Sequence, residues 1–386
     1  MSTPMRQDER ERLMTEVADL LAADQVPMSD STMENEVYRY TDPGYTRREL
    51  DAVFATSPRV LALSAQLPEN GDFVTDDLSG EPLVIMRSED GVARAFYNVC
   101  VHRGTKVVCD EQGNRQRHTC PFHGWVYDTT GTLRAVSSPE AFPDLDPSRQ
   151  ALAPVSVVER HGFIWQLPDG WSEADLVESL GGLDDELDAY EVAGFVLERT
   201  EVIEQPINWK FVIDGFLETY HFRYLHENTI APFARTNFGP TREYGSNVRM
   251  VVLRASYDEH VTRADGLVDP MPHIAVAYQL FPNTVVVWQG THIEVWTSYP
   301  STAAPDQCSI RVSVLAPEPT TTEQQQRGWD RNWAILMGTV LEEDFAVSRR
   351  AQAGYRTGAL THLVYGRNEP ALQAFHRNLA ARIGSG

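Results

Sequence analysis

The sequence predicts an α+β protein with two domains, a mainly β domain at residues 56–168 and a mixed domain at residues 169–386. Short apolar runs separated by turn residues fill the first domain, and none has the length or period of a long helix. In the second domain, strand-like runs between 247 and 315 lie between helical segments expected near 206–226 and 322–353. Strands and helices segregated in this way are typical of the α+β class.

Residues 1–55 are expected to form a helical segment that packs on the mixed domain. Leu13, Val17 and Leu21 recur at the spacing of one helix face. A second short helix is expected at 46–55, after a Pro-Gly pair that interrupts the chain. Both segments are interpreted as packing helices.

Apolar runs and the turns between them predict the strands of each domain. In the mainly β domain, EPLVIMR and VARAFYNV flank Glu89-Asp90-Gly91, which predicts a β-hairpin leading into Cys100. In the mixed domain, an antiparallel sheet is expected from the runs FVLERTEVIE, NVRMVVLRAS, HIAVAYQLF, NTVVVWQG, IEVWTSYP and SIRVSVLAP. The acidic stretch at 171–188 is interpreted as a solvated connection with some helix. The helix at 322–353 is expected to close the domain.

The formal net charge of -22 argues against nucleic acid or an anionic membrane as a partner, because both attract Lys and Arg. No apolar run approaches the roughly 20 residues of a membrane span. The charged N-terminal residues lack the apolar core of a signal peptide, so we expect a cytoplasmic protein. In that compartment Cys109 and Cys308 are expected to be free thiols, since the other two cysteines belong to the motif described next.

Two Cys-His pairs form the most specific motif of the chain. They are Cys100-x-His102 and Cys120-Pro-Phe-His123, separated by residues 103–119. One cysteine and one histidine in each loop suit a [2Fe–2S] cluster in which two thiolates hold one iron and two imidazoles hold the other. A structural zinc site is the alternative, but zinc fingers usually place both cysteines in one loop and both histidines in the other.

The flanking residues, NVCVHRGTKV and CPFHGWVYDTTGTL, closely resemble the cluster loops of Rieske oxygenases and their ferredoxins. Gly104 and Gly124 follow the ligand pairs, where the backbone must approach the cluster closely. Rieske proteins of respiratory complexes have an extra cysteine in each loop, but this chain has Phe122 at the second position. The resemblance therefore implies a cluster of the lower-potential type that supplies an oxygenase.

A second candidate metal site lies in INWKFVIDGFLETYHFRYLHENT, where His221 and His226 follow Glu218. Two imidazoles and one carboxylate form the facial triad of non-haem Fe(II) oxygenases. Five residues turn an ideal helix by roughly 500°, so the helix must distort or end near His226 for both imidazoles to bind one iron.

This segment also resembles the mononuclear-iron segment of Rieske oxygenase α subunits, and the resemblance covers nearly the whole chain. It implies a Rieske [2Fe–2S] domain joined to a helix-grip catalytic domain, an antiparallel sheet with helices. It also implies a third Fe(II) ligand on the last long helix, in VLEEDFAVSRRAQAG. Asp344 is the predicted ligand, with Glu343 and Glu342 as competitors.

Glu218 occupies the place where many family members have an Asp that connects a cluster histidine to an iron histidine across a subunit boundary. Glutamate at this position is shared with the carnitine and betaine oxygenases, and Asp214 is a rival for the same role. A carboxylate between two metal-bound imidazoles would fix their tautomers. If this bridge crosses between subunits, a head-to-tail ring is required, and the family's usual ring is a homotrimer, with or without a β subunit.

The resemblance implies an oxygenase component that uses O2 and electrons from a separate NAD(P)H reductase, with or without a ferredoxin. No G-x-G-x-x-G fingerprint follows a predicted strand, so NAD(P)H is expected to be oxidised on the partner. The product would be a hydroxylated, cis-diol or dealkylated molecule. A Rieske electron carrier or a scaffold is the non-enzyme alternative, but a carrier needs only the first domain.

The substrate is expected to be a small aromatic or other hydrophobic molecule, as in the catabolism of aromatic hydrocarbons. Aromatic residues are predicted to line the pocket: Phe216, Phe233, Tyr278, Phe281, Trp288 and Trp296. The same rings could surround a quaternary ammonium by cation–π contacts, which would suit a carnitine- or betaine-like substrate. The sequence leaves both alternatives open.

Overall fold

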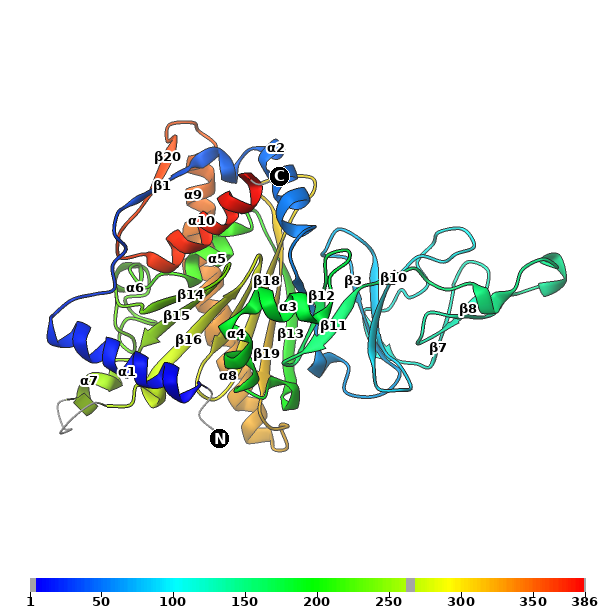
Figure 1. The fold of residues 1–386 in the computed structure, drawn as a ribbon, viewed down its shortest axis with the longest axis horizontal. Helices are drawn as coiled ribbons and strands as arrows, with labels where there is room; N and C mark the ends of the chain where they lie inside the picture. The colour runs from blue at the N-terminus through cyan, green and yellow to red at the C-terminus, as the bar shows by residue number, and fades with distance from the viewer. Residues whose placement is uncertain (1–4, 262–267, 385–386) are drawn as a thin grey trace. The chain divides into compact units, whose positions relative to one another are not determined.

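The structure, a computed structural model, describes residues 5–261 and 268–384. It divides into two compact units, each shown in Figure 1. The first unit consists of Met1–Ser57 and Ala174–Gly386, and the second consists of Pro58–Glu173. The domain limits expected from the sequence lie near these boundaries.

The second unit is built from short antiparallel strands in three sheets. Their orders are β10-β5-β4-β3-β6, β11-β12-β2 and β7-β8-β9. The strands are β2 (Arg59–Leu63), β3 (Asp72–Asp76), β4 (Leu83–Arg87), β5 (Ala93–Tyr97), β6 (Gln112–Asn114), β7 (Arg117–Thr119), β8 (Val126–Asp128), β9 (Leu133–Ala135), β10 (Pro154–Val155), β11 (Val157–Arg160) and β12 (Phe163–Gln166).

The predicted hairpin is confirmed, because β4 pairs with β5 from Leu83 opposite Tyr97 to Arg87 opposite Ala93. Its turn places Gly91 at φ +79°, a left-handed conformation that favours glycine. Phe73, Val84 and Tyr127 belong to a buried cluster that also contains Cys100 and Cys120. The cluster loops therefore rest directly on a packed core.

The first unit is built around one antiparallel sheet of order β13-β19-β18-β17-β16-β15-β14. The strands are β13 (Val196–Gln205), β14 (Thr241–Tyr244), β15 (Asn247–Leu253), β16 (Ile274–Leu280), β17 (Thr284–Trp288), β18 (Ile293–Pro300) and β19 (Cys308–Ala316). Every run predicted for this sheet forms a strand. Side chains alternate between the two faces along each strand, so each face has its own set of partners.

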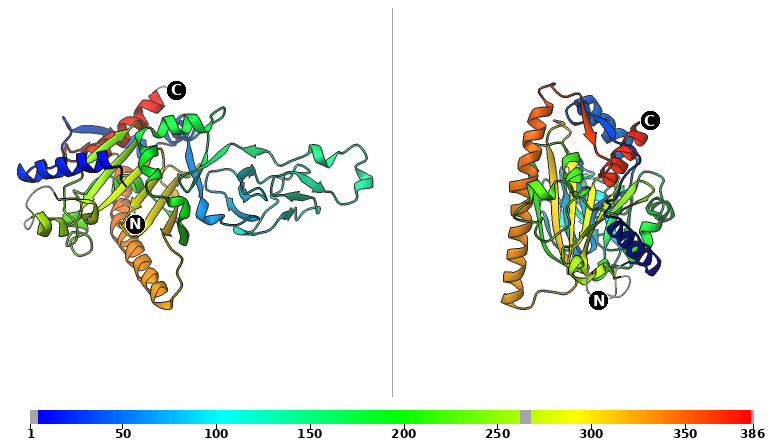
Figure 2. Two further views of the ribbon diagram at one scale, coloured as in Figure 1. Left: turned by 60° about the horizontal axis from the view of Figure 1, so that its bottom comes forward. Right: turned by 90° about the vertical axis from the view of Figure 1, so that its left-hand side faces the viewer.

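Helices cover both faces of this sheet, and α8 and α9 run along one of them (Figure 2). The helices of the unit are α1 (Gln7–Ala22), α2 (Pro43–Glu49), α3 (Glu173–Leu180), α4 (Gly182–Asp188), α5 (Lys210–Phe216), α6 (Phe222–Leu225), α7 (Ser256–Val261), α8 (Glu323–Thr339), α9 (Phe345–Tyr355) and α10 (Pro370–Gly384). The core between the sheet and the helices contains Trp209, Trp296, Trp333 and Phe375.

Residues 171–188 contain helix as expected, in α3 and α4, but the interpretation of their acidic side chains as a solvated face is wrong for Glu186. Glu186 on α4 is completely buried, and it accepts hydrogen bonds from Arg249 (2.6 Å), from Tyr278 (2.8 Å) and from Tyr244. A buried carboxylate of this kind is stable because a guanidinium and two hydroxyl groups replace its water. Arg249 also contacts Glu9 of α1, so α1 and α4 are bound to the same face of the sheet.

Of two helix predictions, the structure corrects the first and confirms the second with an added detail. The single helix expected at 206–226 is divided into α5 and α6, with a break from Leu217 to His221. The segment at 322–353 is α8 and α9 joined by a π-helical turn at Val340–Asp344. Period-3.6 patterning detects a helical segment but does not locate such interruptions.

The last long helix pair does not close the domain, contrary to the prediction. After α9 the chain forms β20 (His362–Tyr365), which pairs with β1 (Met33–Glu36), and then α10. Phe375 and Leu379 of α10 are buried in the core of the unit. The C-terminal segment is therefore part of the domain core.

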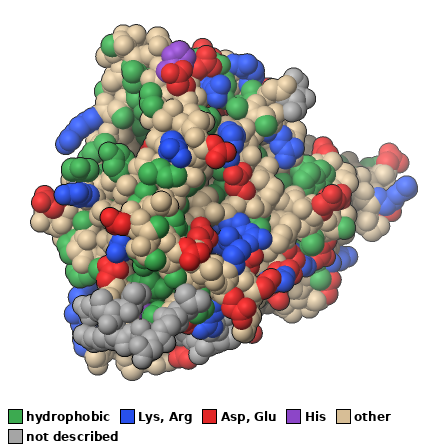
Figure 3. Space-filling view, turned by 60° about the vertical axis from the view of Figure 1, so that its left-hand side comes forward, with side chains coloured by type: hydrophobic (Ala, Val, Ile, Leu, Met, Phe, Trp, Pro, Cys, Tyr) green, Lys and Arg blue, Asp and Glu red, His purple; other side chains and the backbone are tan. Residues whose placement is uncertain are grey.

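The surface and the helices reflect a chain that is rich in charged residues and has no long apolar run. Acidic, basic and apolar side chains are interspersed on the face shown in Figure 3. Within the described residues, no helix is long and apolar enough to cross a membrane. Cys109 is exposed and Cys308 is buried, and both are free thiols, as expected.

Candidate metal centres

The two Cys-His loops of the second unit have matching backbone geometry. Cys120 directly follows β7, and Cys100 follows β5. In each loop a glycine amide returns to the cysteine carbonyl: Gly104 N to Cys100 O at 2.9 Å, and Gly124 N to Cys120 O at 3.0 Å. Both glycines have positive φ, +78° and +70°, where a residue with a side chain would be strained.

The side chains of these loops converge, and each histidine has a ring nitrogen without a hydrogen-bond partner. Cys100 and Cys120 are both buried, and the rings of His102 and His123 lie 4.6 Å apart. The Nδ1 atoms of both histidines are shielded from solvent and have no hydrogen-bond partner. Unpaired buried polar atoms are unfavourable unless a ligand satisfies them. Two thiols and two free imidazole nitrogens are the donor set that a [2Fe–2S] cluster of this type requires.

Aromatic residues hold the cluster loops in place. The ring of His102 stacks on Trp125, with centroids 4.7 Å apart and planes 5° apart. The hydroxyl of Tyr127 lies 3.2 Å from Cys100 Sγ and accepts a hydrogen bond from the backbone N–H of Val101 at 3.1 Å. These contacts fix the position of one thiol and the plane of one imidazole.

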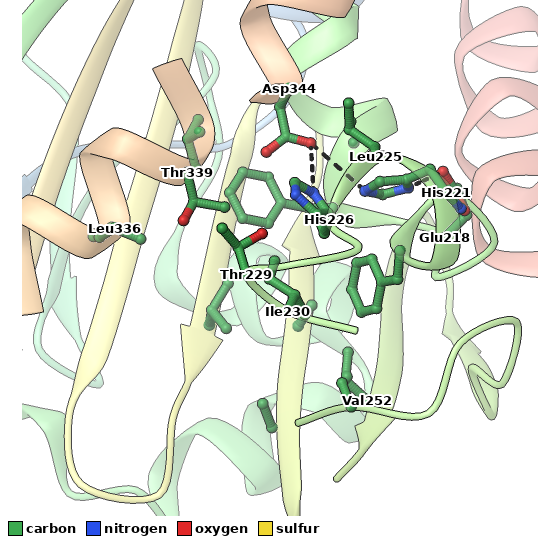
Figure 4. A pocket seen from close by; sticks show the side chains of 18 of the residues that line it. Glu218, His221, Leu225, His226, Thr229, Ile230, Val252, Leu336, Thr339 and Asp344 are labelled. Carbon is green, nitrogen blue, oxygen red and sulfur yellow. Dashed lines mark hydrogen bonds and ion pairs between the residues drawn. The ribbon is translucent and has the colours of Figure 1, made fainter. Parts of the chain in front are cut away.

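His221, His226 and Asp344 converge in the first unit, and Figure 4 shows them at one end of a cavity. One potential ligand atom from each residue lies within 4.8 Å of the others. Asp344 Oδ1 is 3.1 Å from His226 Nε2 and 3.6 Å from His221 Nε2. Two imidazoles and one carboxylate at this separation fit the facial triad of a non-haem iron, which leaves coordination positions open.

The local backbone explains how two histidines five positions apart face one point. α6 is a single turn, with His221 before its first residue and His226 after its last. His226 has φ -102° and ψ 32°, outside the α-helical region, so the ideal rotation no longer applies. This is the interruption that the sequence argument required.

The carboxylate comes from the π-helical turn between α8 and α9. A π turn adds a residue to the helical repeat, which changes the direction of the side chains that follow, and such turns are frequent at functional sites. In this turn Asp344 faces the histidines, whereas Glu342 is exposed. Glu343 accepts a hydrogen bond from His226 Nδ1 at 2.5 Å and from Thr229 Oγ1 at 2.8 Å. Glu343 thus contacts a candidate ligand from the side away from Asp344.

Glu218 makes the equivalent contact to the other imidazole. Its carboxylate accepts hydrogen bonds from His221 Nδ1 and from the backbone N–H groups of Tyr220 and His221, the last at 3.1 Å. Asp214 instead accepts hydrogen bonds from Tyr40 Oη at 2.6 Å and His376 Nε2 at 2.8 Å. Of the two rivals for the bridging role, Glu218 is the one that touches a candidate iron ligand.

A cavity of about 700 Å³ opens on the three converging residues. One wall is the sheet, through Met250, Val252, Ala277 and Val287, and another is the α8 surface that includes Leu336. Apolar side chains from the chain around α6, including Leu225 and Ile230, complete the part drawn in Figure 4.

Two of the six aromatic residues predicted for the pocket, Phe216 and Phe233, line this cavity. Tyr278 and Trp288 lie on the opposite face of the sheet, where both rings contact Tyr190. Their strand neighbours Ala277 and Val287 line the cavity instead, as alternation along a strand requires.

Phe281 and Trp296 also fall outside the lining. Phe281 belongs to the buried core cluster, and the ring of Trp296 is covered by that of Phe216, 5.3 Å away. The cavity is also lined by polar residues that were not predicted from the sequence: Arg254, Gln289, Thr291, His292 and Glu294. Alternation on β15 from Met250 through Val252 could have indicated Arg254.

Comparison with protein families gives two matches. Residues 192–385 match the ring hydroxylating alpha subunit (catalytic domain), and residues 57–148 match the Rieske [2Fe-2S] domain. The chain therefore belongs to the ring-hydroxylating α-subunit family. Membership confirms the predicted fold class and the two predicted cofactors, a [2Fe–2S] cluster and a mononuclear iron.

Individual relatives include both monooxygenases and dioxygenases. The chain is 35% identical over 184 residues to the carnitine monooxygenase oxygenase subunit of Escherichia coli (strain K12), covering 47% of this chain and 49% of the relative. It is 32% identical over 187 residues to biphenyl 2,3-dioxygenase subunit alpha of Rhodococcus jostii (strain RHA1), covering 47% and 41%. The matches span about half the length of these curated relatives or less.

Solved structures show the same fold. The quaternary ammonium Rieske monooxygenase CntA in complex with L-carnitine has a TM-score of 0.75 at 21% identity, covering 90% of this chain and 94% of that chain. Naphthalene 1,2-dioxygenase with bound indole has a TM-score of 0.73 at 19% identity, covering 93% of each. At these identities the likeness supports the fold alone.

Proposed function

We propose that this protein is the terminal oxygenase component of a Rieske oxygenase system. Electrons come from a separate NAD(P)H-dependent reductase, directly or through a ferredoxin, and O2 is used to hydroxylate, dihydroxylate or dealkylate a small hydrophobic molecule. One observation carries this proposal: His221, His226 and Asp344 converge at the end of an apolar cavity.

Each metal centre has its own set of residues in this proposal. Cys100, His102, Cys120 and His123 hold the [2Fe–2S] cluster, and His221, His226 and Asp344 hold the iron. The iron, when bound, supplies O2 activation at the positions its three protein ligands leave open.

Glu218 and Glu343 orient the two iron-binding imidazoles. Each carboxylate accepts the Nδ1–H of one histidine. This contact fixes the tautomer in which Nε2 carries the lone pair directed toward the metal. Glu218 is also the proposed link to a cluster histidine of a neighbouring subunit.

The proposed assembly is a head-to-tail homotrimer in the cytoplasm, with or without a β subunit. Apolar or aromatic side chains are exposed beside both centres: Phe122 and Val101 next to the cluster ligands, and Tyr220 and Tyr224 next to His221. Such groups are favourable when a partner covers them. A similar solved structure, a quaternary ammonium monooxygenase, is described as giving insight into inter-subunit electron transfer in that protein.

A hydrophobic substrate, aromatic or aliphatic, is favoured by the cavity lining. Phe216, Phe222 and Phe233 are among its residues, together with Met, Val, Leu and Ile side chains. A quaternary ammonium substrate is the second candidate, because similar proteins include carnitine, glycine betaine and choline monooxygenases. However, three aromatic residues that could have formed a cation–π cage, Tyr278, Trp288 and Trp296, do not line the cavity.

The test is a screen of the reconstituted protein with a surrogate NADH reductase. Arenes, steroids, hydrophobic acids and quaternary amines are compared, scoring substrate-dependent O2 uptake together with product formation. We expect a product with one or more of the screened classes and none from Asp344→Ala with the same reductase. Electron uptake by the cluster without any product, in protein that retains its mononuclear iron, would contradict the proposal and favour an electron carrier.

A further inference from the structure

One end of the cavity is lined by a group of polar side chains that is distinct from the candidate iron ligands and from Asp214 and Glu369, which also line the cavity. Arg254 directly follows β15 and lies on the same strand face as Val252. Gln289, His292 and Glu294 come from the end of β17, the turn and the start of β18. These residues, together with Thr291, are called the polar end below.

The polar end lies far from the candidate iron ligands. Along α8 and the turn after it, the residues that line the cavity extend from Asn332 to Asp344. These two residues are twelve positions apart, and twelve positions correspond to about 18 Å along a helix at ~1.5 Å per residue. The ring of His292 packs against Trp329, at the Asn332 end of this row, with centroids 5.5 Å apart. A molecule that touches both ends must be elongated, roughly 15 Å in length.

Arg254 brings a positive charge to this end without an acidic partner among the described residues. It donates hydrogen bonds to the backbone oxygen of Gln289 at 2.8 Å and, at 3.5 Å, to its side-chain oxygen. Burial lowers the pKa of Arg254, which means that its charge is partly desolvated. A desolvated guanidinium without a carboxylate leaves a strong site for an anion.

The one carboxylate of the polar end is already engaged. Glu294 is buried and accepts hydrogen bonds from Gln289 Nε2 at 3.1 Å and from Trp296 Nε1 at 3.4 Å. It also lies 3.5 Å from His292 Nε2. Both oxygens of Glu294 therefore already accept hydrogen bonds from side chains of the protein.

His292 contributes a second unsatisfied group. Its Nδ1 lies 3.1 Å from the hydroxyl of Thr291, while its Nε2 is buried and has no hydrogen-bond partner. When the Thr291 hydroxyl donates to Nδ1, Nε2 carries a hydrogen and becomes a donor. Arg254 and His292 then both carry N–H donors, which a carboxylate would match.

We propose that the polar end binds the carboxylate of an elongated, otherwise apolar substrate, with Arg254 and His292 as its hydrogen-bond donors. The apolar part of that substrate fills the cavity, and its other end lies beside His221, His226 and Asp344. This inference rests on the proposed function in one respect, the placement of the oxidised carbon at that triad. It names the substrate class as hydrophobic carboxylic acids.

Three ligands built on the same phenyl-substituted eight-carbon chain test the proposal: 8-phenyloctanoate, its methyl ester and the trimethyl(8-phenyloctyl)ammonium ion. Their dissociation constants are measured by calorimetry on the metal-loaded protein. We expect the carboxylate to bind about tenfold more tightly than the ester, because a hydrogen bond to a charged group contributes that much or more. Arg254→Gln should remove this advantage and leave the affinity for the ester unchanged.

Arg235→Gln is the matched control. Arg235 pairs with Asp258 at 3.1 Å and does not line the cavity, so its replacement should keep the preference for the carboxylate. Equal binding of acid and ester, tighter binding of the ammonium ion, binding of none of the three, or an unchanged preference in Arg254→Gln would overturn the inference. Because calorimetry needs no turnover, absent oxygenation would count against the proposed function and not against the polar end.

Discussion

At the scale of single residues, the candidate iron site is defined by paired acidic contacts. Each imidazole faces Asp344 with Nε2 and a glutamate with Nδ1: Glu218 for His221 and Glu343 for His226. A carboxylate on Nδ1 fixes the tautomer and the plane of a metal-binding histidine. The two glutamates therefore orient the imidazoles toward the proposed iron.

In protein saturated with iron, Glu218→Gln should retain both metals and reduce turnover by about 10–100-fold, a typical effect of losing such a contact. The amide keeps the size of the side chain but removes the charge that faces His221. Iron and sulfide contents, the visible spectrum of the cluster and product formation are measured together. Glu227→Gln, an exposed neighbour, is the control. Normal coupled oxygenation in Glu218→Gln would exclude Glu218 from electron transfer.

Glu343→Gln should weaken binding of the mononuclear iron by about 10–100-fold, because His226 loses a charged acceptor on Nδ1. The affinity is measured by competition with a chelator, and the cluster spectrum should not change. Glu342→Gln alters the adjacent exposed residue and should bind iron as the original protein does. If Glu343→Gln lost all iron and Asp344→Ala kept it, Glu343 would be the ligand.

Site residues can be predicted from the sequence only where they belong to a specific motif. The order Cys-His, Cys-His is specific, and the structure brings all four residues of that motif into one loop pair. Aromatic residues are weaker predictors because composition does not tell which face of a strand a side chain occupies. Tyr278 and Trp288 therefore point to the opposite face, and Arg254 was overlooked.

At the scale of elements, short interruptions of helices create the site. The break between α5 and α6 allows His221 and His226 to converge, and the π turn between α8 and α9 directs Asp344 toward them. Helical periodicity in the sequence identifies both segments but averages over several turns. The strands of the first unit were easier to predict, since alternation and turn residues repeat along each of them.

A buried ion pair joins α5 to α2. Lys210 Nζ donates to Glu49 Oε1 at 2.7 Å, Trp209 Nε1 donates to Glu49 Oε2 at 3.0 Å, and both charged side chains are almost fully buried. Burial lowers the pKa of Lys210, while Glu49 opposes that change. The pair holds the first turn of α5, which precedes the iron segment.

Lys210→Met should lower the free energy of unfolding by about 3–5 kcal/mol, because Glu49 remains buried without its cation. Denaturant titration of the whole protein measures the change. Lys106→Met, which breaks the exposed pair with Asp77, should cost less than about 1 kcal/mol. Glu49→Gln combined with Lys210→Met should recover much of the loss. If Lys106→Met and Lys210→Met lowered the free energy of unfolding equally, the buried pair would not have the stabilising role proposed for it.

At the scale of the whole molecule, the two metal centres belong to separate compact units of one chain. The proposed trimer would bring the cluster of one subunit to Glu218 of the next. The family match covers both units and supports both cofactors. The sequence indicates a division of this kind because each expected domain has its own motif and its own strand pattern. It did not predict β20 and α10, which complete the core of the first unit.

Mixed assemblies test transfer between subunits. Cys100→Ala removes a proposed cluster ligand and Asp344→Ala removes a proposed iron ligand, so each variant alone should be inactive. Coexpression should restore part of the turnover, because an intact cluster then lies beside an intact iron of the neighbouring chain. Activity is measured on assemblies purified through two different tags. Complete inactivity of correctly assembled mixtures would show that both centres must be intact in one chain.

The central claim is that one chain carries a [2Fe–2S] cluster and a separate iron held by His221, His226 and Asp344. The most direct measurement is the iron and acid-labile sulfide content of the purified protein, compared with that of Asp344→Ala. The account predicts about three irons and two sulfides per chain, falling to about two irons and two sulfides in the variant. Two irons per chain in the fully loaded original protein, or zinc in place of iron at either centre, would contradict it.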